Sequence, residues 1–253
     1  MIRRLLTAFN MAWGMFCSIP LPRNRWDDAA APLILPLFPF VGLILGGLWF
    51  GGVWLLQYWG IPLLITAAFF MLFPPVVTGF IHLDGYMDTN DAILSRRPLE
   101  EKRRILKDSH TGAFAVITLA CLFVLSFAAS YSALEEKKNL LVLVFILPLS
   151  RCLSGLGLLI GKTMPTSGYG AFFKKDTGAA HKGFLIGLAL LLLAAGTLLC
   201  GWTGLAVLTV EAVGFLIAFA IAYRQLEGVS GDVSGYALTI SESVALLALA
   251  IFR

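Results

Sequence analysis

The sequence predicts an all-α protein, a polytopic membrane helix bundle of about seven transmembrane helices preceded by an N-terminal interfacial or re-entrant helix. Hydrophobic residues make up 58% of the 253 residues and charged residues only 13%, and the mean hydropathy is +0.86. Several uncharged runs reach the roughly 20 residues that a helix needs to cross a bilayer. A soluble domain of this length cannot bury so much apolar surface, so a water-soluble fold is close to excluded.

The uncharged runs divide into seven predicted spans. Residues 29–81 carry no formal charge and are too long for one crossing. The stretch Trp59-Gly60-Ile61-Pro62 splits them in two, because glycine and proline interrupt helices. A second break is expected at Gly201-Trp202. The remaining spans are predicted at 111–134, 139–161, 183–200, 202–223 and 235–252.

An apolar segment at residues 5–19 precedes these spans and follows Arg3-Arg4. It is too short to cross a bilayer, and Ile19-Pro20-Leu21-Pro22 ends it. A secretory signal peptide is the alternative, but the segment contains Phe9-Asn10 and Trp13-Gly14 and lacks an Ala-x-Ala cleavage pattern. An interfacial or re-entrant helix is the better interpretation.

The positive charges predict the orientation. Fifteen of the 19 Lys and Arg fall in residues 1–31, 82–110, 162–182 and 224–234, which seven spans place on one side, and three fall on the other. Positive residues in short loops favour the cytoplasm. We therefore expect a protein of the cytoplasmic membrane, with these segments inside and the C-terminus outside. No soluble domain is left over, so residues 1–253 form one integral membrane domain.

Three aspartates follow the second predicted span at helical spacing. Asp84, Asp88 and Asp91 are separated by four and three residues, so on a helix their carboxylates share one narrow face. Like charges on adjacent turns repel each other, and such a face requires a positive partner unless it is simply solvated. Mg²⁺ prefers carboxylate oxygens and phosphates. The pattern predicts an Mg²⁺ site for phosphoryl transfer.

A basic segment follows this cluster and ends at Asp108. Pro98 and two glutamates predict a short helix that folds back and presents Asp108 to the same metal. The segment's cations would contact either substrate phosphates or anionic lipid headgroups; they are Arg96, Arg97, Arg103, Arg104 and Lys107. Asp91 or Asp108 would be the general base, because either could come within hydrogen-bond distance of the attacking hydroxyl.

Ionisable residues inside predicted spans are candidate site residues, because they are costly there unless paired or facing a polar cavity. Arg151 would bind a phosphate, or form a structural pair with Glu211. Glu242 follows Asp232 by ten residues, about 15 Å along a continuous helix, and would lie below the mouth of a cavity. His82 is equally a substrate-binding or a structural histidine. The glycine-rich loop at residues 161–182 would fold over a nucleotide or serve as an ordinary connection.

The sequence resembles the cobalamin synthase family, the adenosylcobinamide-GDP ribazoletransferases. The pieces that carry the resemblance occur in order over nearly the whole chain. They are Ile19-Pro20-Leu21-Pro22, Phe38-Pro39-Phe40-Val41-Gly42, His82-Leu83-Asp84-Gly85 through Asp91, Lys107-Asp108-Ser109 with Gly112, Ser150-Arg151, Gly231-Asp232-Val233-Ser234-Gly235, and Glu242. Ala92, Ala115 and Thr239 depart from the family's pattern.

The resemblance implies an Mg²⁺-dependent membrane transferase. The ribose hydroxyl of α-ribazole, or of its 5′-phosphate, would attack the phosphate attached to cobinamide and release GMP. Together, the resemblance and the residue patterns predict three groups of site residues. The expected metal ligands are Asp84, Asp88, Asp91 and Asp108, and the expected catalytic residues are Asp91 and Asp108. The expected substrate-binding residues are His82, Arg96, Arg104, Lys107, Arg151, Asp232 and Glu242.

Other functions and partners stay open. The aspartate spacing is also similar to that of CDP-alcohol phosphatidyltransferases, and a transporter is the alternative from another class, although no repeated halves are visible. The expected partners are adenosylcobinamide-GDP, α-ribazole or its 5′-phosphate, and membrane lipids, without nucleic acid. A homodimer and contacts with other corrinoid-assembly enzymes are further hypotheses.

Overall fold

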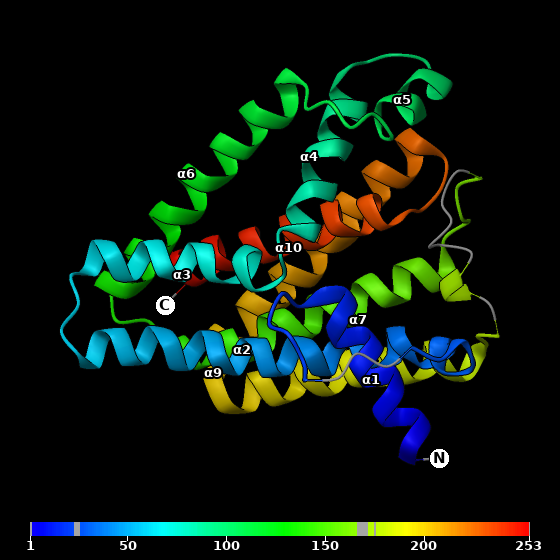
Figure 1. Ribbon diagram of the computed structural model, residues 1–253. Helices are drawn as coiled ribbons and strands as arrows, with labels where there is room; N and C mark the ends of the chain where they lie inside the picture. The colour runs from blue at the N-terminus through cyan, green and yellow to red at the C-terminus, as the bar shows by residue number, and fades with distance from the viewer. Residues whose placement is uncertain (1, 23–25, 166–171, 175, 253) are drawn as a thin grey trace.

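The computed structural model describes residues 2–22, 26–165, 172–174 and 176–252. Over these residues the chain is a bundle of helices (Figure 1), and the only β-type pairing in this part is a single parallel bridge between Thr163 and Val229. The predicted all-α membrane bundle is confirmed.

The helices follow the predicted order along the chain. They are α1 (Ile2–Phe16), η1 (Asp28–Leu33), α2 (Ile34–Tyr58), α3 (Leu63–Val77), α4 (Ile81–Leu94), α5 (Leu99–Ile105), α6 (Ala113–Glu135), η2 (Leu140–Val142), α7 (Leu143–Ile160), α9 (Ala179–Leu226) and α10 (Gly231–Ile251). The break between α2 and α3 falls at the predicted Trp59–Pro62 stretch. The short helix predicted after Pro98 is α5.

Five helices of the described chain are long and apolar enough to cross a membrane, or six if α3 and α4 count as one bent span. The long helix α9 (Ala179–Leu226) contains two of the seven predicted spans, those at 183–200 and 202–223. Its backbone leaves the helical region at Gly201 (φ 64°, ψ −145°), where a side chain would be strained. A β-carbon added to Gly204 would clash with the Gly196 carbonyl, although eight residues span about 12 Å in a straight helix. The chain therefore folds back at Gly201, as predicted.

The second predicted span is wrong in its extent. Helix α3 has 15 residues, about 22 Å of helix, which is too short for a hydrocarbon core of about 30 Å. Gly79 and Phe80 then both adopt left-handed backbone angles (φ 61° and 62°), and α4 leaves at 88° to α3. The segment 82–110 was expected to connect two spans on the cytoplasmic side. Its first part instead belongs to α4, which packs against α6 and α10 inside the bundle.

Helix α10 is the centre of the bundle and contacts α4, α6, α7 and α9 (Figure 1). Its contact with α4 is very close: a β-carbon added to Gly85 would lie 2.8 Å from Asp232 Cα, and one added to Gly235 would lie 3.0 Å from the His82 carbonyl oxygen. The Thr239 hydroxyl donates to this same oxygen over 3.1 Å. Small residues let the two helices approach, which brings Asp232 beside α4.

The amino-terminal helix α1 packs on α2, and the turn that follows it is bonded to the end of α3. The Ser18 amide donates to the Val77 carbonyl over 2.8 Å, and the Ser18 hydroxyl lies 3.1 Å from the carbonyls of both Val76 and Val77. These carbonyls end a helix and have no partner within it. The first segment of the chain is therefore tied to the bend before α4.

Candidate active site

A cavity of about 420 Å³ opens where α1, α2, α4, α7 and α10 meet. Asp84 and Asp232 lie at this cavity, as do His82 and the serines Ser154 and Ser234. The rest of its lining is glycine and apolar side chains, namely Gly14, Met15, Phe16, Phe38, Ile81, Leu158, Phe173, Gly231 and Gly235. Its volume falls in the range of about 300–1,000 Å³ that is common for small-molecule sites.

The structure brings four carboxylates together beside this cavity. Asp88 lies within electrostatic range of Asp84 and Asp91 on its own helix and of Asp232 on α10. The three α4 aspartates share one side of a helix, as their spacing predicts. In the described part of the chain, neither Asp84 nor Asp88 has a hydrogen bond or ion pair with a basic group. This acidic face thus lacks a cation from the protein itself.

Asp91 already has a structural partner. Its side chain is buried, and its two oxygens accept from the amides of Gly112 (2.6 Å) and Ala115 (2.9 Å). These amides belong to the first turn of α6, whose N–H groups have no partners within the helix and carry partial positive charge. Asp91 therefore caps α6 from a neighbouring helix, a contact that the sequence alone did not indicate.

Asp108 lies apart from the other aspartates. Its carboxylate is exposed, and Oδ1 accepts from the His110 amide (3.0 Å) and contacts His110 Nδ1 (2.6 Å). These hydrogen bonds, more than any more distant charge, lower the pKa of Asp108. Oδ2 has no hydrogen bond within the described residues. The structure does not bring Asp108 against the α4 aspartates.

The predicted phosphate-binding cations of the basic segment lie at the surface. Arg96, Arg104 and Lys107 are exposed, Arg104 pairs with Glu101 of its own helix, and none of the three lines the cavity. Arg103 has a role that the sequence did not indicate. Its guanidinium donates to the carbonyls of Leu226 and Glu227 (3.1 and 3.4 Å), where a cation stabilises the carboxyl end of α9.

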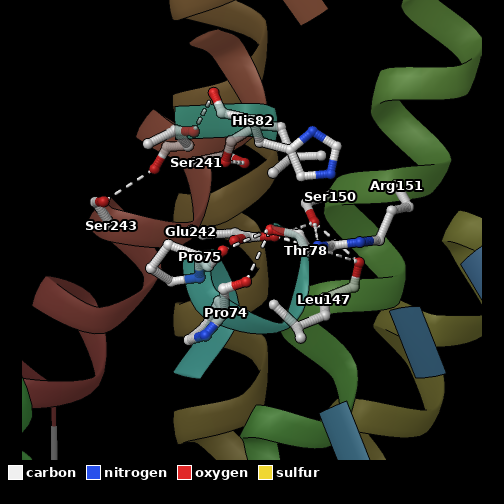
Figure 2. Close-up of polar contacts among 12 residues, drawn as sticks. Pro74, Pro75, Thr78, His82, Leu147, Ser150, Arg151, Ser241, Glu242 and Ser243 are labelled. Carbon is white, nitrogen blue, oxygen red and sulfur yellow. Dashed lines mark hydrogen bonds and ion pairs between the residues drawn. The ribbon is translucent and has the colours of Figure 1, made fainter. Parts of the chain in front are cut away.

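Arg151 is paired with Glu242, not with Glu211. Figure 2 shows the guanidinium of Arg151 and the carboxylate of Glu242 pointing toward each other, and an ion pair joins them. Ser150 donates to the same carboxylate over 2.8 Å. Arg151 is 1% exposed and lies over the ring of Phe38 at 5.7 Å. The expected Arg151–Glu211 pair is thus replaced by a pair between α7 and α10.

Glu211 lies beside this pair without joining it. The side chain is fully buried and within electrostatic range of Glu242 and Arg151, but neither carboxylate oxygen has a hydrogen-bond partner among the described residues. His82 lies between the pair and the cavity, because it lines both the cavity and a smaller hollow of about 50 Å³ that Glu242 also lines. Its Nε2 likewise has no partner there.

The donor chemistry of the acidic face fits a hard divalent cation. Asp84, Asp88 and Asp232 supply carboxylate oxygens, which Mg²⁺ prefers, and they repel one another across the α4–α10 contact. Among the described residues, no three His, Cys, Asp or Glu side chains are yet spaced as ligands of one ion. The carboxylates would therefore have to turn toward a shared ion.

Two parts of the site escaped the sequence reasoning. Phe16 and Phe173 line the cavity, and their spacing in the sequence gives no sign of it. Phe38 belongs to a motif that was noted, although its place in the lining was not predicted. Of the loop expected to fold over a nucleotide, residues 166–171 and 175 lie outside the described residues.

The comparisons with known proteins identify the family of the chain. A family model described as cobalamin-5-phosphate synthase matches residues 8–250. The chain belongs to this family. Proteins named adenosylcobinamide-GDP ribazoletransferase are similar to it over most of their length. One from Clostridium botulinum is 39% identical over 99% of this chain and all of the relative. One from Clostridium perfringens is 38% identical over 96% of this chain and 97% of the relative.

A more distant relative of the same printed name, from Pseudomonas syringae, is 34% identical over 86% of this chain and 87% of the relative. No solved structure matches the chain. The family assignment confirms the resemblance that the motifs indicated.

The three residues expected to depart from the family's pattern lie outside the cavity lining. Ala92 is fully buried and Ala115 is 1% exposed, and the Ala115 amide donates to Asp91. Thr239 donates to the His82 carbonyl and lines the smaller hollow beside His82 and Glu242.

Proposed function

We propose that this protein is an adenosylcobinamide-GDP ribazoletransferase whose reaction takes place where the acidic face of α4 meets the cavity. The observation that carries the proposal is the convergence of Asp84, Asp88 and Asp232 beside a cavity of small-molecule size, in a chain that matches the family from residue 8 to residue 250. In this reaction the ribose hydroxyl of α-ribazole, or of its 5′-phosphate, attacks the phosphorus attached to cobinamide. The bond to the bridging oxygen breaks and GMP leaves.

Mg²⁺ would be held by Asp84 and Asp88, with Asp232 as a further carboxylate from α10. When bound, the ion neutralises charge on the diphosphate and orients it. Asp84 and Asp232 line the cavity, so the reacting phosphate lies at their end of it. The close α4–α10 contact at Gly85 fixes the distance between these carboxylates.

The proton of the attacking hydroxyl needs an acceptor, and Asp91 and Asp108 remain the two candidates. Both oxygens of Asp91 accept backbone amides, so each is already occupied by a hydrogen bond. The hydrogen bonds from His110 to Oδ1 lower the pKa of Asp108 and so weaken it as a base. Its Oδ2, however, has no hydrogen bond among the described residues and is open to a proton, which favours Asp108. This role requires the segment between α5 and α6 to move toward the cavity when substrate binds.

The active site would face the cytoplasm and the C-terminus would lie outside the cytoplasmic membrane. With α3 and α4 taken as one bent crossing, the positive charges support this orientation, because the segments on the same side as α5 then carry fifteen of the 19 Lys and Arg. An alkaline phosphatase reporter fused after α10 should be active, since this enzyme folds only outside. Activity of the same reporter fused after α5 would contradict the assignment.

The function is tested with purified protein in liposomes, by measuring GMP release from adenosylcobinamide-GDP. Release should require both α-ribazole and Mg²⁺, stop on chelation with EDTA, and resume on adding Mg²⁺. CDP-diacylglycerol with an alcohol acceptor should release no CMP. Release of CMP and not GMP would assign the chain to phosphatidyl transfer.

Two variants test the metal role. Asp84→Asn and Asp88→Asn remove charge from the acidic face without changing side-chain size, and each should lower turnover at least a hundredfold while the protein still elutes as one species in detergent. Glu135→Gln is a matched control, because Glu135 lies at the far end of α6 from the Asp91 cap and should keep wild-type turnover. Full turnover in both aspartate variants would refute the metal role.

A further inference from the structure

The cavity has an aromatic wall built from three separate parts of the chain. Phe16 ends α1, Phe38 belongs to α2, and Phe173 lies between α7 and α9. The ring centroids of Phe16 and Phe38 are 4.0 Å apart and those of Phe16 and Phe173 are 6.4 Å apart. Phe16 is half-buried, whereas Phe38 and Phe173 are 1% and 5% exposed and pack behind it. The ring of Phe16 is therefore the main aromatic face that a flat ligand could contact.

The two serines of the lining are already satisfied, whereas Nε2 of His82 has no partner among the described residues. Ser154 and Ser234 are hydrogen-bonded to each other over 2.6 Å, and Ser230 donates to Asp232 over 3.2 Å. The free carboxylate is Asp84, which is exposed. The cavity thus combines an apolar aromatic wall with an acidic group.

The proposed reaction involves two planar bases, the benzimidazole of α-ribazole and the guanine of the GDP group. A lining with an aromatic part and an acidic part fits the first of them better. The base of α-ribazole is a benzimidazole with only apolar substituents on its carbon ring and one unsubstituted ring nitrogen. Guanine carries a carbonyl, an amide N–H and an amino group, and each of these loses free energy when it is buried without a partner. The wall of Phe16, Phe38 and Phe173 offers no such partners. A guanine bound here would have to find them in Asp84, Asp232 or His82, and the proposed reaction uses the two aspartates for the metal and the phosphate.

We propose that this cavity binds the benzimidazole base of the attacking nucleoside, with the ring system against Phe16, Phe38 and Phe173 packed behind it, and the ribose directed toward Asp84 and Asp232. The inference rests on the proposed function and adds to it the location of one substrate. It also gives α1 a role besides membrane contact, since Phe16 supplies part of the wall.

The test separates the two substrates by their KM values. Phe16→Leu keeps an apolar side chain and removes the ring, whereas Phe16→Tyr keeps a ring. Phe9→Leu is the matched control, because Phe9 lies on the same helix, packs against Trp13 at 6.0 Å, and does not line the cavity. Each protein is assayed in liposomes with one substrate saturating and the other varied.

Phe16→Leu should raise the KM for α-ribazole about tenfold, which corresponds to about 1.4 kcal/mol, while kcat and the KM for adenosylcobinamide-GDP change less than twofold. Phe9→Leu should stay within about twofold of wild type, and Phe16→Tyr, which keeps a ring, should raise the KM for α-ribazole less than Phe16→Leu does. A rise confined to the KM for adenosylcobinamide-GDP, or no change in either KM, would overturn the proposal. Elution from a sizing column and the melting temperature establish that each variant is folded.

A binding measurement makes the result independent of turnover. Equilibrium dialysis of α-ribazole against the wild-type protein, without the second substrate, should show binding that Phe16→Leu weakens and that guanosine does not displace. Displacement by guanosine at an equal concentration would show that the cavity takes a purine instead. If wild-type protein releases no GMP at all, the proposed function fails; if it releases GMP but Phe16→Leu matches it in every measurement, only the location of the base fails.

Discussion

The contact between α4 and α10 can be tested by adding a single methyl group. In Gly85→Ala the new β-carbon would lie 2.8 Å from Asp232 Cα and 2.9 Å from the Asp232 carbonyl oxygen, whereas ordinary contacts begin at 3.4 Å. Both neighbours are backbone atoms and cannot rotate away. The two helices must therefore separate by about 0.6 Å, the difference between 3.4 and 2.8 Å, or bend locally.

Two effects should follow from this separation. Overpacking of a tight contact costs typically about 1–3 kcal/mol, which lowers the melting temperature of a chain of this size by about 2–12 °C. Moving Asp84 and Asp88 relative to Asp232 should also lower kcat/KM at least tenfold, since a displacement of about 1 Å can cost a hundredfold in rate.

The assay is GMP release in liposomes together with thermal melting in detergent. Gly187→Ala is the matched control: Gly187 lies within α9 and a β-carbon there would have no neighbour within 4 Å, so both quantities should stay at wild-type values. If Gly85→Ala keeps the wild-type kcat/KM and melting temperature, α4 and α10 do not meet as described, and the reasoning about the shared acidic face is wrong.

Three further outcomes are expected. Asp91→Asn should destabilise the protein by about 1–2 kcal/mol, because a charged cap on the first turn of α6 is lost; an unchanged melting curve would rule out the cap. Glu242→Gln should cost about 3–5 kcal/mol, since it leaves Arg151 buried without its countercharge, and combining it with Arg151→Met should recover part of the loss; equal stability of single and double variants would argue against the pair. Asp108→Asn should lower kcat with no change in melting temperature, because this carboxylate is exposed; a large loss of stability would show a structural role instead.

Much of the fold follows from where uncharged runs start and stop. The break at Gly201 was predictable because the apolar run from 183 to 223 is too long for one crossing. Gly201-Trp202, near its middle, offers a place for the chain to turn back across the membrane. The bend between α3 and α4 was not predictable, because hydropathy identifies apolar segments but does not show where the helix axis changes direction. Gly79 and Phe80 make that bend, and Phe80 is not a residue type that signals a left-handed turn.

The candidate site was predicted in part. Helical spacing correctly grouped Asp84, Asp88 and Asp91 on one side of a helix. It could not reveal that Asp91 faces the first turn of α6, because the partner is a pair of backbone amides that any residue would carry. Nor could it show that Glu242, and not the expected Glu211, is the partner of Arg151, since each is far from it along the chain and all three lie in apolar segments. Such pairings depend on helix packing.

The cavity draws residues from both extremes of the polypeptide, with Gly14, Met15 and Phe16 from the first helix and Gly231, Asp232, Ser234 and Gly235 from the last. A ribosome therefore makes one wall at the outset and must finish almost the entire protein before the opposite wall exists. Chains that end before α10 would keep Phe16, Phe38, Phe173 and Asp84 but lack Asp232 and the α10 side of the cavity. Such fragments should have no turnover, and restoring it with a separately expressed α10 would require that helix to pack against α4, α7 and α9 on its own.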